Sequence, residues 1–230
     1  MAQDVSVAEA AEPDDPAAPV FFVSYWRPDP PASGAGPPRE ANRFVRRFFD
    51  DLTEDVDNLI GSLPGRHPGF LDVVRGGELW EKRLLHAAGT CQVFVSLLSG
   101  PYLAGSAWCA REWDLFSRRR VVPRPGRAEP TGHDASAIVP VLWAPPAGPL
   151  PPAVADVPLF VPGRLRDDFR ADYRAEGLLG LLRTGKEPIY QAVVWRIAQH
   201  VERIRRHHRV EPLHLPGPAG LRTTFERGGR

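Results

Sequence analysis

Two uninterrupted apolar runs constrain the fold of this chain more than any other feature. Residues 20–26 read VFFVSYW and residues 91–98 read CQVFVSLL, and both are rich in β-branched and aromatic side chains. A run of this kind is typical of a strand that is buried on both faces, as in a parallel sheet. Similar short runs predict further strands at 69–72, 137–143 and 158–161.

Amphipathic helices are predicted between these runs. Over residues 42–63 the apolar positions recur at spacings of three and four, which indicates a helix with one buried face. Comparable patterns predict helices over 78–88, 106–120 and 187–208. Strands that alternate with helices favour right-handed crossovers and a parallel sheet covered on both faces. The sequence therefore predicts an α/β fold: a flavodoxin-like doubly wound sheet of about five mostly parallel strands, with helices on both faces and ligands at the carboxyl ends of the strands.

Proline and glycine mark the limits of the predicted domain. Residues 1–19 contain five acidic side chains and no lysine or arginine, and they hold little that a core would bury. We predict a disordered acidic, proline-rich N-terminus over 1–19, a single domain over 20–208 and a flexible C-terminal tail over 209–230. A further proline-rich insert, 28–39, directly follows the first predicted strand.

Charge and composition exclude several classes of protein. The chain has 29 basic and 28 acidic side chains, so it lacks the strong positive field of a general nucleic-acid binder, and no nucleic-acid partner is expected. No apolar run approaches the roughly 18 residues of a membrane span, and the N-terminus lacks the pattern of a secretory signal, so we expect no membrane association. Two cysteines cannot form a disulfide framework, which favours reduced thiols and a cytoplasmic location. No spacing typical of metal ligands occurs.

The predicted helix 106–120 carries a glutamate on its apolar face. Ser106 is a candidate N-cap, and helical spacing puts Glu112 between Trp108 and Phe116, whereas Asp114 falls on the polar face. A carboxylate on a buried face is unfavourable unless it is paired or opens onto a cavity. Two interpretations therefore remain: a catalytic carboxylate at the mouth of a pocket, or a structural ion pair, for which the candidate partners are Arg27, Arg75 and Arg83.

These motifs, in this order, resemble the TIR (Toll/interleukin-1 receptor) domains, in particular bacterial and plant members. The resemblance covers about residues 20–143 and extends more weakly to about 205. The sequence SGPY at 99–102, followed by SAWCARE at 106–112, is similar to the family signature S-P-x-Y-x-x-S-x-W-C-x-x-E. The composition also resembles that of actinobacterial TIR-like proteins of the FxsC type. The other matching segments are FVSY at 22–25, FLD at 70–72, GELW at 77–80, VFVSLLS at 93–99 and IVPVL at 138–142.

The resemblance implies an activity and a set of site residues. Enzymatic TIR domains cleave the nicotinamide–ribose bond of NAD⁺, so NAD⁺ is expected as a substrate, with no cofactor and no metal. Glu112 takes the position of the catalytic glutamate. The resemblance further implies bacterial defence or signalling, self-association, and a protein partner in a signalling or peptide-modification system. The implied substrate-binding residues are Trp108, Tyr25, Trp26, Arg27, Asp72 and Ser99, and the implied gating and assembly loop, 73–77, contains Arg75, Gly76 and Gly77.

Other interpretations of the same sequence stay open. A TIR-like module that only binds proteins would use the same surfaces without catalysis, and a nucleoside deoxyribosyltransferase also relies on a glutamate. The 28–39 insert lies at the expected mouth of the site, where it would either cover or block the pocket. For Tyr25 and Trp26 core packing is an equal alternative to ligand contact. Trp80 is expected in the core, and no basic residue is expected beside Asp72.

Overall fold

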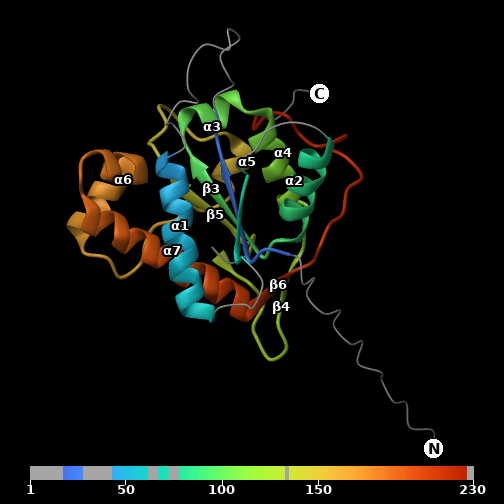
Figure 1. Cartoon of the computed structure of the whole chain (residues 1–230), viewed down its shortest axis with the longest axis horizontal. Coiled ribbons are helices and arrows are strands. Elements are labelled where there is room, and N and C mark those ends of the chain that lie inside the picture. Colours follow the sequence, from blue (N-terminus) through green and yellow to red (C-terminus); the bar gives the residue numbers. More distant parts are fainter. Residues whose placement is uncertain (1–17, 28–42, 62–66, 73–77, 133–134, 227–230) are drawn as a thin grey trace, which may run out of the picture.

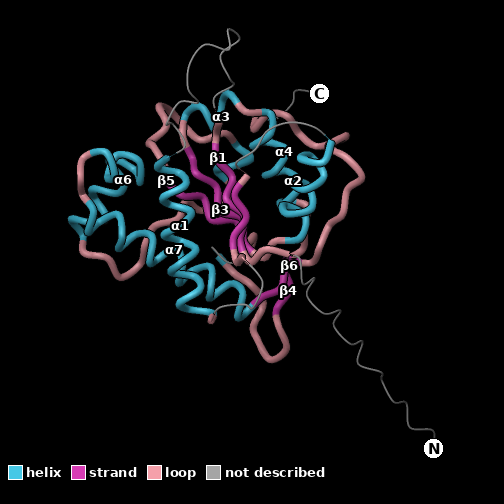
Figure 2. Tube along the Cα trace, in the orientation of Figure 1, coloured by secondary structure: helices cyan, strands magenta, loops and turns pink. Residues whose placement is uncertain are grey.

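A four-stranded parallel sheet forms the centre of the molecule. The computed structural model describes residues 18–27, 43–61, 67–72, 78–132 and 135–226. Within them the strands run in the order β2-β1-β3-β5, and all three neighbouring pairs are parallel. Figure 2 shows them side by side between the helices. The predicted fold class is confirmed. The strands are β1 (Phe21–Tyr25), β2 (Gly69–Leu71), β3 (Val93–Leu98) and β5 (Ile138–Leu142).

Helices cover both faces of this sheet. On one face α1 (Arg43–Ile60) packs against α7 (Glu187–His207), and on the other α2 (Glu78–Thr90) packs against α4 (Ala107–Ser117) (Figure 1). Because α1 joins β1 to β2 and α2 joins β2 to β3, successive crossovers lie on opposite faces, which is the doubly wound arrangement. The remaining helices are α3 (Gly100–Gly105), α5 (Pro152–Ala155) and α6 (Asp167–Arg183), the last packed against α7.

The segment 158–161, predicted as a fifth strand, is irregular in the structure. It begins with a proline and is followed by another, and proline lacks the N–H group that a sheet ladder needs. The segment still lies along β5. Three hydrogen bonds form on the side of β5 that faces away from β3. The N–H groups of Ile138 and Leu142 donate to Ser136 Oγ (3.3 Å) and to Tyr173 Oη (2.9 Å). The Pro140 carbonyl oxygen accepts from the Phe160 N–H (2.9 Å).

The chain beyond α7 packs onto the domain as far as residue 226, although the sequence predicted a flexible tail from 209. β6 (His208–Val210) pairs antiparallel with β4 (Val121–Pro123). Leu221 and Phe225 are buried in the core. The buried Arg119 fastens this segment to the junction of α2 and β3, because its guanidinium donates to the carbonyl oxygens of Ala88, Cys91, Val210 and Glu211.

Several predicted segments lie outside the described residues. These are nearly all of the N-terminal segment 1–19, the 28–39 insert, and the 73–77 loop with Arg75, Gly76 and Gly77. Among the helices that the structure does describe, none is both long and apolar enough to cross a membrane.

Candidate functional site

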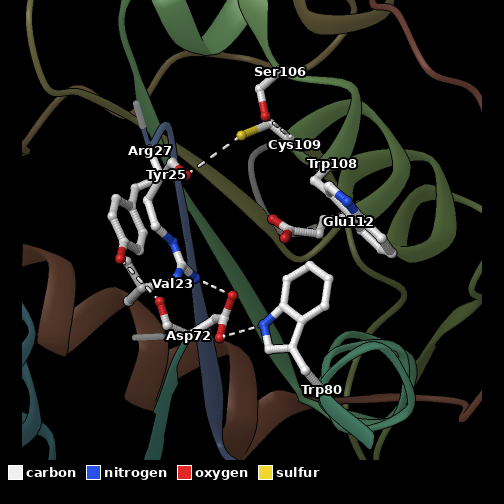
Figure 3. Close-up of a pocket in the computed structure, with 9 residues that line it drawn as sticks. All are labelled: Val23, Tyr25, Arg27, Asp72, Trp80, Ser106, Trp108, Cys109 and Glu112. Atoms are coloured by element: carbon white, nitrogen blue, oxygen red, sulfur yellow. Dashed lines mark hydrogen bonds and ion pairs between the residues drawn. The ribbon is translucent and has the colours of Figure 1, made fainter. Parts of the chain in front are cut away.

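A small pocket lies beyond the carboxyl ends of β1 and β2, on the face of the sheet covered by α2 and α4. The space inside it that can hold the centre of a water molecule is about 20 Å³, which is room for about one water. Figure 3 shows its side chains converging from β1, α2 and α4 and from the residues just beyond β1 and β2. The lining residues are Val23, Tyr25, Arg27, Asp72, Trp80, Ser106, Trp108, Cys109 and Glu112.

Helix α4 brings the acidic and aromatic groups of the signature to this pocket. Ser106 caps the helix as predicted, its Oγ accepting the Cys109 N–H at 3.2 Å. Trp108 and Glu112 are one turn apart, both half-buried and both at the pocket wall. The expected position of Glu112 on the inward face is therefore confirmed.

Helical spacing alone predicted that Asp114 lies on the solvated face of α4. In the structure Asp114 is buried instead. It is 6% exposed, forms ion pairs with Arg118 and Arg222, and accepts the backbone N–H of Arg222. The C-terminal segment, which the sequence did not predict to pack here, covers that side of α4.

A chain of two buried hydroxyl groups ends at the Glu112 carboxylate. The Ser24 hydroxyl donates to Glu112 Oε2 at 2.5 Å, and Tyr102 Oη lies 3.0 Å from Ser24 Oγ. Since the serine hydroxyl has one proton and gives it to the carboxylate, the Tyr102 hydroxyl is the donor to Ser24. Burial raises the pKa of Tyr102 well above its usual value, so this phenol stays a donor. The chain Tyr102–Ser24–Glu112 joins α3, β1 and α4.

A second carboxylate lies on the opposite wall of the pocket. Asp72 forms an ion pair with Arg27, and its Oδ1 accepts the Trp80 Nε1–H at 2.8 Å. The expectation that no basic residue lies beside Asp72 was therefore wrong. Trp80, expected in the core, is half-buried at the pocket instead, with its ring edge-on to Trp108 at 4.9 Å and 74°.

Tyr25 both packs in the core and borders the pocket. It is 7% exposed, and its hydroxyl donates to the Asp72 carbonyl oxygen at 2.9 Å. The Arg27 guanidinium lies 5.2 Å from its ring centre. Burial is the main cause that raises the pKa of Tyr25 to about 12, and burial also raises the pKa of the Cys109 thiol. Neither group is ionised near neutral pH, so neither is a nucleophile there.

Ser99 and Trp26 do not line the pocket. Ser99 is buried as the N-cap of α3, where its Oγ accepts the Tyr102 N–H at 3.3 Å. Trp26 is half-buried, and its indole nitrogen faces Gly105. The structure thus brings together Glu112, Trp108, Tyr25, Arg27 and Asp72 from the predicted set.

Sequence reasoning missed Ser24 and Tyr102. Both residues fall in segments that resemble the TIR family, FVSY at 22–25 and SGPY at 99–102, and Ser24 is also a polar residue inside an otherwise apolar strand, but neither signal gives a role beside Glu112.

The chemistry of the site rests on carboxylates, arginine and aromatic rings. Within the described part of the chain, no three His, Cys, Asp or Glu residues are grouped so as to hold a metal ion. No protein-family model, curated protein or solved structure matches the chain.

Proposed function

We propose that this chain is a TIR-like domain that cleaves NAD⁺ at the nicotinamide–ribose bond, in bacterial defence or signalling. One observation carries the proposal. The Glu112 carboxylate, which accepts a hydrogen bond from Ser24, lines the same pocket as the Trp80 and Trp108 indole rings, beyond the carboxyl ends of β1 and β2. The resemblance of the 99–112 segment to the TIR signature supports the same assignment.

The reaction suits a carboxylate that is held in this way. When the bond between the nicotinamide nitrogen and the ribose carbon breaks, both bonding electrons leave with nicotinamide, which departs neutral. Positive charge then develops on the ribose ring, and the Glu112 carboxylate stabilises it, as carboxylates do in glycoside hydrolysis. Water attacks the ribose carbon and loses a proton to give ADP-ribose, whereas attack by another group of the substrate gives a cyclic product. Partial exclusion of water strengthens the electrostatic stabilisation.

Other groups in the pocket supply binding contacts in this proposal. Trp108 and Trp80 offer aromatic surfaces for the nicotinamide ring, and Arg27 offers a guanidinium for a phosphate of the substrate. Space for about one water is too little for nicotinamide. We propose that the Trp80 ring or the Arg27–Asp72 pair moves when the substrate enters, and that self-association through TIR-like surfaces stabilises the open arrangement.

A second candidate function is a non-catalytic TIR-like interaction module. The narrow pocket favours it, because the ion pair of Arg27 with Asp72 and the indole of Trp80 occupy the space that a substrate would need. In that case the chain of hydroxyls that ends at Glu112 would serve only to satisfy a half-buried carboxylate.

Nicotinamide release from NAD⁺ discriminates between the two. We would measure it with the purified chain at high concentration, with and without a crowding agent, and compare Glu112→Gln. A matched control is Glu176→Gln, which alters a glutamate on α6 that pairs with Lys186 away from the pocket. Release that depends on Glu112 and not on Glu176, from variants with native circular dichroism, would support the enzyme.

Two other results would overturn the proposal. Absence of release under every assembling condition would favour the interaction module. Equal release from the Glu112→Gln variant and the unaltered chain would mean that another group performs the chemistry.

A further inference from the structure

A second and larger concave site lies on the other face of the sheet from Glu112. It is a groove of about 690 Å³ between the C-terminal half of α7, the segment that follows β5, and the end of α1. The α7 helix covers the face opposite α4 (Figure 1). We call it the arginine groove. Its lining residues are Leu59, Phe160, Val161, Gly163, Arg164, Arg196, Gln199, His200, Glu202, Arg203 and Arg206.

The arginine groove concentrates positive charge in a chain whose net charge is only +1. Four arginines line it against a single acid, Glu202, which pairs with Arg206 at 3.2 Å. Arg196 is oriented by neutral acceptors, the side-chain oxygen of Gln199 at 2.8 Å and the carbonyl oxygen of Arg164 at 3.1 Å. Neutral acceptors fix a guanidinium in place without cancelling its charge, which leaves it able to bind an anion.

His200 adds a second oriented contact. An Arg203 nitrogen lies 2.7 Å from His200 Nδ1, and because a guanidinium only donates, this histidine nitrogen accepts and carries no proton. The imidazole is 9% exposed and packs against the Phe160 ring at 5.6 Å. The position of the Arg203 head group is thus tied to a buried ring.

The wall opposite α7 combines an exposed cation with apolar surface. Arg164 is exposed and has a left-handed backbone with φ of 57°, a conformation that non-glycine residues adopt only where the surroundings impose it. Leu59, Phe160 and Val161 provide apolar surface, and Val161 is 41% exposed. The groove therefore offers guanidinium groups on two walls beside an apolar strip.

We propose that the arginine groove binds a polyphosphate, either inorganic or carried by a nucleoside. Each phosphate presents several acceptor oxygens to donors that approach from different directions, which matches guanidinium groups on two walls better than a single planar carboxylate does. The volume accommodates a ligand of nucleotide size. The apolar strip would contact the nucleoside part when one is present.

Isothermal titration calorimetry of the full chain tests this site. The probes are inorganic tripolyphosphate, ATP without added metal, and hexaglutamate as a carboxylate ligand. The groove variant is Arg196→Gln with Arg203→Gln, and the single Arg203→Gln variant guards against misfolding of the pair. The control is Arg120→Gln with Arg174→Gln, which removes two exposed arginines from other helices or turns.

The proposal predicts that binding of tripolyphosphate or ATP weakens about tenfold for each groove arginine removed and is unchanged in the control. This result would support it. Tighter binding of ATP than of tripolyphosphate would assign the site to a nucleotide, and equal binding would assign it to inorganic polyphosphate. Equal weakening in both double variants, preference for hexaglutamate, or no binding at millimolar ligand would overturn it.

Discussion

Ser24, on β1, donates the hydrogen bond that orients the candidate catalytic carboxylate of Glu112. We predict that Ser24→Ala lowers kcat for nicotinamide release about 10- to 100-fold with little change in KM, because hydrogen bonds to charged groups contribute about 1.5–3 kcal/mol. The lost contact is the one that orients Glu112 Oε2. Steady-state kinetics of the folded variant checks the prediction.

Tyr102→Phe is the matched variant one step further from the carboxylate. It removes the hydroxyl that lies 3.0 Å from Ser24 and leaves the contact between Ser24 and Glu112 in place. We expect a smaller fall in kcat than for Ser24→Ala. A larger fall for Tyr102→Phe, or an unchanged kcat for folded Ser24→Ala, would contradict the positioning role of Ser24.

Among single residues, helical spacing predicted those of the site that lie on α4 and did not predict those that come from other elements. Glu112 and Trp108 were found because a period of 3.6 residues assigns them to one face of α4. Ser24 contacts Glu112, and Tyr102 contacts Ser24, only after three elements pack, and these two contacts span 88 and 78 residues of sequence. Trp80 is predicted in the core because its helix has few other large apolar residues, a reason that does not foresee its hydrogen bond to Asp72.

Helix α6 is kinked at Gly177, where the backbone departs from helical geometry. Gly177 has φ of 64°, and a Cβ atom added there would lie 2.6 Å from the carbonyl oxygen of Trp143. We predict that Gly177→Ala lowers the free energy of unfolding by roughly 2–4 kcal/mol, since backbone strain and a steric clash act together. Urea unfolding followed by circular dichroism measures the change.

Gly185 is a control for Gly177, because its backbone is also left-handed but an added Cβ would meet no neighbouring atom. Its φ is 72°, but nothing lies within 4 Å of the position of an added Cβ. Gly185→Ala should therefore cost only about 1 kcal/mol, the strain of the left-handed backbone. Equal costs for the two substitutions would show that the contact with Trp143 does not constrain α6.

Elements with a strong local pattern were predicted from the sequence, and elements defined by distant contacts were not. The apolar runs of β1 and β3 and the regular spacing in α1 and α7 fix the type of each element. The first half of α6, DDFRADYRAEG, is mostly polar and ends in a glycine. It therefore lacks the regular spacing of apolar residues from which a helix is predicted. The segment 158–161 has a strand-like composition, but its flanking prolines remove the donors that pairing requires.

Burial of ionisable groups makes the whole fold sensitive to alkaline pH. Burial raises the pKa of Cys91 from its usual 9.0 to about 11, and of Tyr25 from 10.0 to about 12. The unfolded chain loses these protons first, so their contribution to stability is complete below pH 9 and decreases between about pH 9 and 12. Urea midpoints should therefore fall steadily across this range.

Tyr25→Phe isolates one part of that dependence. The variant lacks a phenol to ionise, so its stability should fall less steeply above pH 10 than that of the unaltered chain. Parallel slopes for the two proteins would exclude Tyr25 as a source of the alkaline sensitivity.

The contacts along the outer side of β5 limit strand addition at that edge of the central sheet. An exposed edge strand offers a row of free amide and carbonyl groups to which a strand of another chain can add. Along β5 the N–H groups of Ile138 and Leu142 are already used, Pro140 has none to offer, and its carbonyl accepts from Phe160. These groups are therefore not available to a strand of another molecule, and within the described four-stranded sheet such a strand would add more readily at the β2 edge.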